Sequence, residues 1–205
     1  MQKLARYVTT LRAACILFDH GFVQEQAALQ RMLDEIQEDV TFLAFGLIFD
    51  KLTPLHETYL AAFYQEEFDP TTGKPGDQDR PMPPRKNIRA YIARMEGAAA
   101  DPSRRGEVTR QVSKAYSGYV HAASPQIMDM YGGSPLRFHL SGMKGTERHD
   151  EHREDLWNYF YRGILAFSFA AKAFGADTLF EDISSFAQSF AQQAGHNYKP
   201  GRADA

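Results

Sequence analysis

Cysteine and tryptophan are almost missing from this chain of 205 residues, which contains one of each. A single cysteine, Cys15, cannot form an internal disulfide, and it excludes every zinc site that needs several cysteine ligands. Because the neighbours of Cys15 are small and apolar, we expect an inert thiol in the core. The scarcity of cysteine also fits a reducing compartment.

Long apolar runs are missing too. The most apolar stretches, 42–49 and 163–171, are far shorter than the roughly 20 residues of a membrane-spanning helix. The first residues show no basic start followed by an apolar stretch and a cleavage site, so we expect no signal peptide. These absences predict a cytoplasmic protein that does not enter a membrane. A charged share of 24% is ordinary for a globular chain and excludes global disorder.

The sequence has no internal repeat and no alternating pattern long enough for a sheet. Apolar residues recur at helical spacing instead, over 2–19, 22–52, 54–68, 85–99, 103–121, 147–174 and 177–194. We therefore predict an all-α fold, a bundle of six to seven mostly antiparallel helices that forms one domain over 1–195.

The connections between these helices are also predicted. Five prolines and two glycines make 69–84 a long mobile loop. The segment 122–147 is expected to be an irregular insertion with a short strand at 136–140, and 196–205 a flexible tail.

Three apolar surfaces are expected to form the core. The run 42–49 is apolar on all sides, so it should lie at the centre with Leu43 and Leu47 buried. The helix over 147–174 should turn a heptad-like stripe inward, and the last helix a second one. These two stripes are Leu156, Phe160, Ile164, Phe167, Ala171 and Phe174, and then Leu179 or Phe180, Ile183, Phe186 and Phe190.

Charge is unevenly distributed along the chain. From 20 to 69 there are ten acidic and two basic residues, and from 85 to 114 there are eight basic and three acidic residues. The two segments either face each other in the fold, or the basic one faces a ligand that carries phosphate. Arg89, Arg110 and Lys114 are the candidate phosphate contacts in the second case.

Two polar groups are candidates for one binding pocket. Arg31 and Glu35 share a helix face, Glu38 continues it and Asp39 lies beside it. This group is either a solvated surface with an ordinary ion pair or a polar site at the edge of the core. The second group is Tyr116, Tyr119 and His121, at a helix end where they either pack and cap or reach a ligand. We predict a pocket formed by Arg31, Glu35, Asp39, Tyr116, Tyr119 and His121.

A metal site is the alternative. The segment 147–155 is rich in possible ligands, and His149 and His152 lie one turn apart, so they could bind a divalent metal together with Glu38. The other interpretation is that this segment is only the solvent-exposed start of a helix, where acidic residues are favoured. The chain has no Glu-x-x-His motif of the kind that di-iron bundles use, and the main prediction is no metal and no cofactor.

The step from Arg31 to Glu35, followed much later by Tyr116-Ser117-Gly118-Tyr119-Val120-His121, resembles bacterial all-helical proteins of the abortive-infection and HEPN-like type. The resemblance, over roughly 5–175, implies a helical bundle, often dimeric and sometimes active in phage defence. Active HEPN members are metal-independent ribonucleases that carry an arginine, four to six residues and then a histidine. Arg148 to His152 leaves three residues and Arg110 to His121 leaves ten, so nuclease activity is not implied.

The functional prediction is a cytoplasmic helical-bundle protein that binds a nucleotide or RNA in its polar pocket and forms a homodimer. One alternative is a metal-dependent helical enzyme that uses Glu, Asp and His ligands. The other is a homodimeric interaction protein without catalysis.

Overall fold

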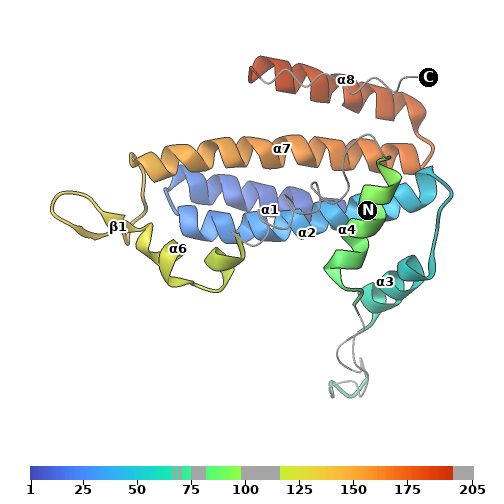
Figure 1. The fold of residues 1–205 in the computed structure, drawn as a ribbon, viewed down its shortest axis with the longest axis horizontal. Coiled ribbons are helices and arrows are strands. Elements are labelled where there is room, and N and C mark those ends of the chain that lie inside the picture. The colour runs from blue at the N-terminus through green and yellow to red at the C-terminus, as the bar shows by residue number, and fades with distance from the viewer. Residues whose placement is uncertain (67, 69–70, 75–81, 98–115, 196–205) are drawn as a thin grey trace.

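The computed structural model describes residues 1–66, 68, 71–74, 82–97 and 116–195. These residues form helices α1 (Gln2–Asp19), α2 (Val23–Ile48), α3 (Pro54–Tyr64), α4 (Arg85–Met95), α6 (Ser124–Met128), α7 (Glu147–Ala173) and α8 (Asp177–Gln193). Residues 116–120 are helical as well, and β1 (Tyr131–Gly132) pairs antiparallel with β2 (Arg137–Phe138). The predicted all-α fold is confirmed (Figure 1).

The frame of the bundle is made of α1, α2 and α7, which lie side by side (Figure 1). A short turn at Gly21 reverses the chain between α1 and α2, and α8 folds back along α7. The helices α2 and α7, however, run parallel rather than antiparallel, because the long connection through α3, α4 and α6 returns the chain to the starting end. The contacts between them show this direction, because the residue numbers increase along both helices in the same order. The contacting pairs are Gln26 with His152, Asp34 with Tyr159, and Phe45 with Phe169.

Tyr7 holds α1 against α7 in the middle of this frame. It is almost fully buried, and its hydroxyl donates a hydrogen bond of 2.6 Å to the carbonyl of Tyr159. A Cβ atom at Gly163 would lie 2.6 Å from the Tyr7 ring, so only glycine permits this close approach of the two helices. The side chains that surround this contact are Leu4, Leu33, Ile36, Val40, Ala166 and Ala170.

The end of α2 is not buried on all sides. The prediction that 42–49 lies at the centre of the core is therefore wrong for the face that carries Leu43 and Leu47. Phe42 and Phe45 are buried in a cluster with α3 and α4, but Leu43 is half-buried and Leu47 is 51% exposed. The reason is position: α2 ends at the rim of the bundle, where α3 and α4 cover only one of its sides.

The predicted stripes of α7 and α8 are also partly wrong. Phe160, Phe174, Leu179 and Phe186 are exposed, and small residues are buried in place of several of them: Ala166, Ala170, Ala187 and Ala191. Small side chains let helices pack closely, which moves the larger aromatic side chains to the flanks of the contact. Cys15 is half-buried rather than in the core.

The irregular insertion contains more regular structure than the sequence indicated. The strand expected at 136–140 is present as Arg137–Phe138, and its partner strand and α6 were not predicted. Most of the loop 69–84 and all of the tail 196–205 lie outside the described residues. Among the helices that the structure describes, none combines the length and the apolar composition needed to cross a membrane.

Candidate functional site

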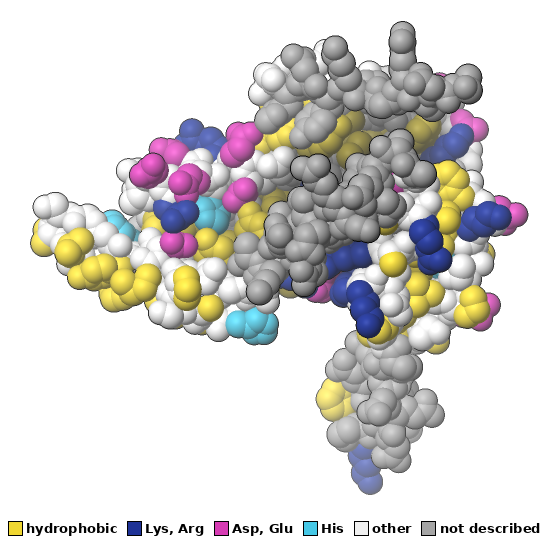
Figure 2. Space-filling view, viewed as in Figure 1, with side chains coloured by type: hydrophobic (Ala, Val, Ile, Leu, Met, Phe, Trp, Pro, Cys, Tyr) yellow, Lys and Arg dark blue, Asp and Glu magenta, His cyan; other side chains and the backbone are white. Residues whose placement is uncertain are grey.

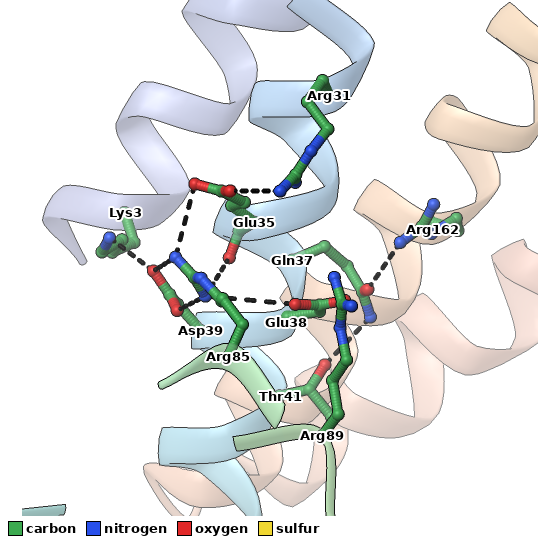
Figure 3. A network of polar contacts seen from close by, with 10 residues as sticks. All are labelled: Lys3, Arg31, Glu35, Gln37, Glu38, Asp39, Thr41, Arg85, Arg89 and Arg162. Carbon is green, nitrogen blue, oxygen red and sulfur yellow. Dashed lines mark hydrogen bonds and ion pairs between the residues drawn. The ribbon is translucent and has the colours of Figure 1, made fainter. Parts of the chain in front are cut away.

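A network of charges joins α1, α2 and α4 around Asp39 (Figure 3). The Asp39 side chain is fully buried, and Lys3 Nζ donates to its Oδ2 over 2.6 Å. Arg85 approaches the same carboxylate from α4 with both terminal nitrogens, bonding Oδ1 through Nη1. Burying a carboxylate is costly unless it is paired and hydrogen-bonded, and Asp39 has two cationic partners.

Glu38 and Glu35 extend the network on either side of Asp39. The Glu38 carboxylate accepts a hydrogen bond of 2.7 Å from Arg89 Nε, and burial raises its pKa above the usual range despite that arginine. Glu35 lies 2.6 Å from Arg31 and 3.5 Å from Arg85, with its side chain 39% exposed. The predicted ion pair within α2 is therefore present, and it is the most solvent-accessible part of the network.

This network answers part of the question that the charge distribution left open. Arg85 and Arg89 belong to the basic segment, and both pair with carboxylates of the acidic segment. The two segments thus face each other at these positions, and the Nε of Arg89, predicted to contact phosphate, is bonded to Glu38. Arg110 and Lys114 lie outside the described residues.

The second predicted group lies against α7 rather than beside the network. The Tyr116 ring meets the edge of Tyr159 at 6.1 Å, and burial raises its pKa. The Tyr119 hydroxyl donates to Asp129 over 3.1 Å, its ring lies 5.9 Å from His152, and burial raises its pKa to about 12. His121 is exposed.

The residue of α2 that reaches the tyrosines is Asp34. Its Oδ1 accepts a hydrogen bond of 3.1 Å from the Tyr159 hydroxyl and a second from Arg162. Arg162 also donates to Gln37 over 3.0 Å. Asp39 thus pairs with residues of α1 and α4, whereas Tyr116 and Tyr119 contact α7, and neither cavity considered below is lined by any of the six residues of the predicted pocket.

The α7 side of α2 carries polar atoms that the sequence analysis missed. Gln30 is fully buried, and among the residues that the structure describes neither its amide oxygen nor its amide nitrogen has a hydrogen-bond partner. The same holds for the amide oxygen of Gln26 and for Oδ2 of Asp34, and for Nδ1 of His152 across from them. Residues 26, 30 and 34 are spaced four apart, a polar stripe on one helix face that the sequence itself displays.

The alternative metal ligands are not brought together. His149 stacks on Phe18 and its Nε2 donates to the Phe18 carbonyl over 2.9 Å, while Glu38 pairs with Arg89. His152 is buried, with a pKa that burial lowers. In the described ranges, no group of three or more His, Cys, Asp or Glu side chains is placed to hold a metal ion.

An apolar pocket of about 550 Å³ opens between the start of α1, the last turns of α2, helix α3 and the end of α7. Its size lies within the range of small-molecule sites in proteins, which is roughly 300–1,000 Å³. The apolar walls include Leu43, Ala44, Leu47, Leu52, Leu60, Phe63, Ala173 and Phe174. The misassigned Leu47 is one of them, which explains its exposure.

Two of the polar side chains in the wall of this apolar pocket are His56 and Lys3. His56 is held by both ring nitrogens, since Nε2 donates to the Phe42 carbonyl and Nδ1 accepts from the backbone N–H of Thr53. Burial lowers its pKa, which favours the neutral ring. The ammonium group of Lys3 lies 5.0 Å from the Phe63 ring and 5.7 Å from the Tyr59 ring.

A second, smaller cavity of about 310 Å³ lies between the hairpin and the start of α7. Figure 2 shows basic and acidic side chains gathered over this end of α7. Arg148 is already paired there, with Asp129 at 3.0 Å and Glu151 at 2.6 Å. Arg148 therefore has two carboxylate partners at this cavity.

Comparison with family models, with curated proteins and with solved structures finds no match to this chain. The likeness to HEPN-like proteins stays a prediction from the sequence, and the geometry of the site carries the functional argument.

Proposed function

We propose that this chain is a binding protein for a small apolar molecule, held in the pocket between α1, α2, α3 and α7. The observation that carries the proposal is the pocket itself, about 550 Å³ with mostly apolar walls and a few polar side chains, among them Lys3 and His56. Pockets of this kind, in which a few placed polar groups orient an otherwise apolar ligand, are the usual form of small-molecule sites.

The walls of the pocket support a concave site rather than scattered surface residues. Leu47, Leu60 and Phe174 are each more than 40% exposed, yet they come from three different helices and line one cavity. Bringing an apolar ligand into contact with such surface stabilises the complex by about 25 cal/mol for each Å² removed from water.

A neutral fluorescent probe, N-phenyl-1-naphthylamine, tests this proposal. We expect saturable binding with a blue-shifted emission, and a loss of at least about 10-fold in affinity when Ala173→Trp fills the pocket. Ala61→Trp is the matched control, because Ala61 is exposed on α3 and does not line the pocket. It should bind the probe like the unchanged protein.

Two results would contradict the proposal. The first is equal probe binding by both tryptophan variants. The second is a dimer in analytical ultracentrifugation that becomes monomeric only in Ala173→Trp, since the pocket would then be an interface between two copies.

We propose nucleotide or RNA binding as a second candidate function, favoured by the buried polar stripe of α2. The amides of Gln26 and Gln30 have unpartnered atoms, and glutamine amides recognise the edges of nucleobases. The HEPN-like resemblance supports the same class of ligand and would add a phage-defence role and a homodimer. Titration with nucleoside monophosphates and a short single-stranded RNA tests this candidate, which fails if Gln30→Leu binds them as well as the unchanged protein.

A further inference from the structure

The charged network and the apolar pocket share one residue, Lys3. Its ammonium group bonds Asp39 on one side and faces the Phe63 and Tyr59 rings of the pocket on the other. Both rings line the pocket, so Lys3 places a positive charge at its wall. An apolar cavity with a cationic side chain at its wall is suited to a ligand that has an apolar body and one negative charge.

The network contains more positive than negative charge among its described members. Its cations are Lys3, Arg31, Arg85 and Arg89, and its carboxylates are Glu35, Glu38 and Asp39. The balance is one positive charge when all seven groups are ionised. Burial raises the pKa of Glu38, which favours its neutral form and can only increase this excess.

Lys3 is the cation of this network that lines the pocket. Asp39 is the shared partner of Lys3 and Arg85, and Arg85 engages it with two nitrogens, as Figure 3 shows. A lysine ammonium has three N–H donors, and the bond of 2.6 Å to Asp39 takes one of them. The Lys3 side chain is also 23% exposed, whereas that of Asp39 is fully buried. Lys3 can therefore keep Asp39 and still donate to an anion that enters the pocket.

We propose that the ligand of the pocket is an amphipathic carboxylic acid, with its apolar part between α2, α3 and α7 and its carboxylate bonded to Lys3 Nζ. This inference rests on the proposed function and adds the chemical class of the ligand. His56 does not compete for the role, because both of its ring nitrogens are already hydrogen-bonded. Hydrogen bonds between charged groups are about twice as strong as neutral ones, so the carboxylate sets the preference for the ligand.

Isothermal titration calorimetry of the full chain with octanoate and octan-1-ol tests the inference, because the two molecules share one chain and differ in the head group. We expect octanoate to bind at least about 10-fold more tightly. Acetate, which has the head group without the chain, should not bind measurably.

Variants of Lys3 assign the preference to the ammonium group. Lys3→Gln should weaken octanoate binding to the level of octan-1-ol and leave octan-1-ol binding unchanged. Lys3→Arg keeps the charge and should retain most of the preference for octanoate. Thermal melting of each variant checks that it is folded, since Lys3 also pairs with Asp39.

The outcomes separate the inference from the proposed function. If octanoate and octan-1-ol bind equally, or if Lys3→Gln binds octanoate as tightly as the unchanged protein, the inference is overturned and the apolar pocket stands. If the neutral probe binds and Ala173→Trp abolishes its binding, but octanoate does not bind, the inference is likewise overturned and the apolar pocket stands. If neither octanoate, octan-1-ol nor the neutral probe binds, both proposals fail.

Discussion

The two polar faces of α2 differ in how completely their buried polar side chains are paired. The face toward α1 and α4 carries Glu35, Glu38 and Asp39, and every one of these carboxylates has at least one cation within 4.0 Å. The face toward α7 carries Gln26, Gln30 and Asp34, and each of these has an atom without a hydrogen-bond partner. The two faces differ most at the glutamines, because Glu38 Oε2 on the first face also lacks a hydrogen-bond partner among the described residues, and Asp34 on the second is paired with Arg162.

The difference bears on the stability of the bundle, because both sets of side chains are largely buried. A buried polar group without a partner costs about 1–3 kcal/mol, so the glutamines of the second face lower stability. The first face reduces that cost by drawing Arg85 and Arg89 across from α4. Residues that stabilise the fold and residues with spare hydrogen-bonding capacity are thus less than two turns apart on the same helix.

Removing Asp39 should have the largest effect. Asp39→Ala leaves Lys3 and Arg85 without their shared buried carboxylate, and we expect the free energy of unfolding to fall by about 3–5 kcal/mol. Glu35→Ala is the matched control within the same network. Its side chain is 39% exposed, so the loss should stay below about 1 kcal/mol. Urea denaturation measures both, and equal losses would mean that burial does not distinguish the two carboxylates.

Most of the helical architecture could be predicted from the sequence because local signals define it. The apolar spacing predicted helices over 2–19, 22–52 and 54–68, and these correspond to α1, α2 and α3. The strand at 137–138 followed from a short alternating run. What these signals do not contain is which side of a long helix meets which neighbour.

The candidate site depended on that missing information. Arg31 and Tyr116 were assigned to one pocket because both occupy polar positions near a helix end or a core edge. In the structure, the parallel run of α2 and α7 turns Asp34 toward Tyr159 and Tyr116, and it leaves Glu35 and Asp39 toward α4. The parallel pairing of α2 and α7, whose contacting residues Asp34 and Tyr159 are 125 apart in the chain, depends on packing such as the contact between Tyr7 and Gly163, which no local pattern encodes.

The pocket was missed for a related reason. An all-round apolar run is normally buried, so Leu47 was taken as core. Its exposure follows from how few elements cover the end of α2, and that number is a property of the assembled bundle. The only signal in the sequence was an excess of large apolar residues, Leu47, Leu52 and Leu60, close to a helix end.

A substitution on the face of α2 toward α7 should change the free energy of unfolding by a smaller amount, and in the stabilising direction. Gln30→Leu removes a buried amide that has no hydrogen bond, so the free energy of unfolding should stay unchanged or rise by up to about 1 kcal/mol. Gln26→Leu is the matched control on the preceding turn, because its Nε2 donates to the His152 carbonyl over 3.2 Å. It should lose about 1 kcal/mol. A clear loss in Gln30→Leu would show that this amide is partnered in solution.

The pH dependence of stability should give the smallest effect, and it again concerns the α7 side. Burial lowers the pKa of His152 below its usual value near 6.5, so the unfolded chain binds a proton before the folded chain does. Stability therefore falls as the pH decreases from about 6.5 toward the lowered pKa, by at most about 1.4 kcal/mol per pH unit for one group. His152→Gln should flatten this part of the curve measured by urea denaturation.

The effect of His152 must be taken as the difference in the pH dependence of stability between His152→Gln and the unchanged protein, because other groups titrate in the same pH range. Lowering of the His56 pKa by burial acts in the same direction, and the raised pKa of Glu38 acts against it. Asp155, 3.8 Å from His152, favours protonation of the ring, so Asp155→Asn should extend the pH-dependent fall to lower pH. The charged groups around His152 that the comparison must keep constant are Asp129, Arg148 and Glu151. A curve that is equally steep with and without His152 would show that this ring takes up its proton at the same pH in the folded and the unfolded chain, and that burial on the α7 side of α2 does not disfavour its charged form.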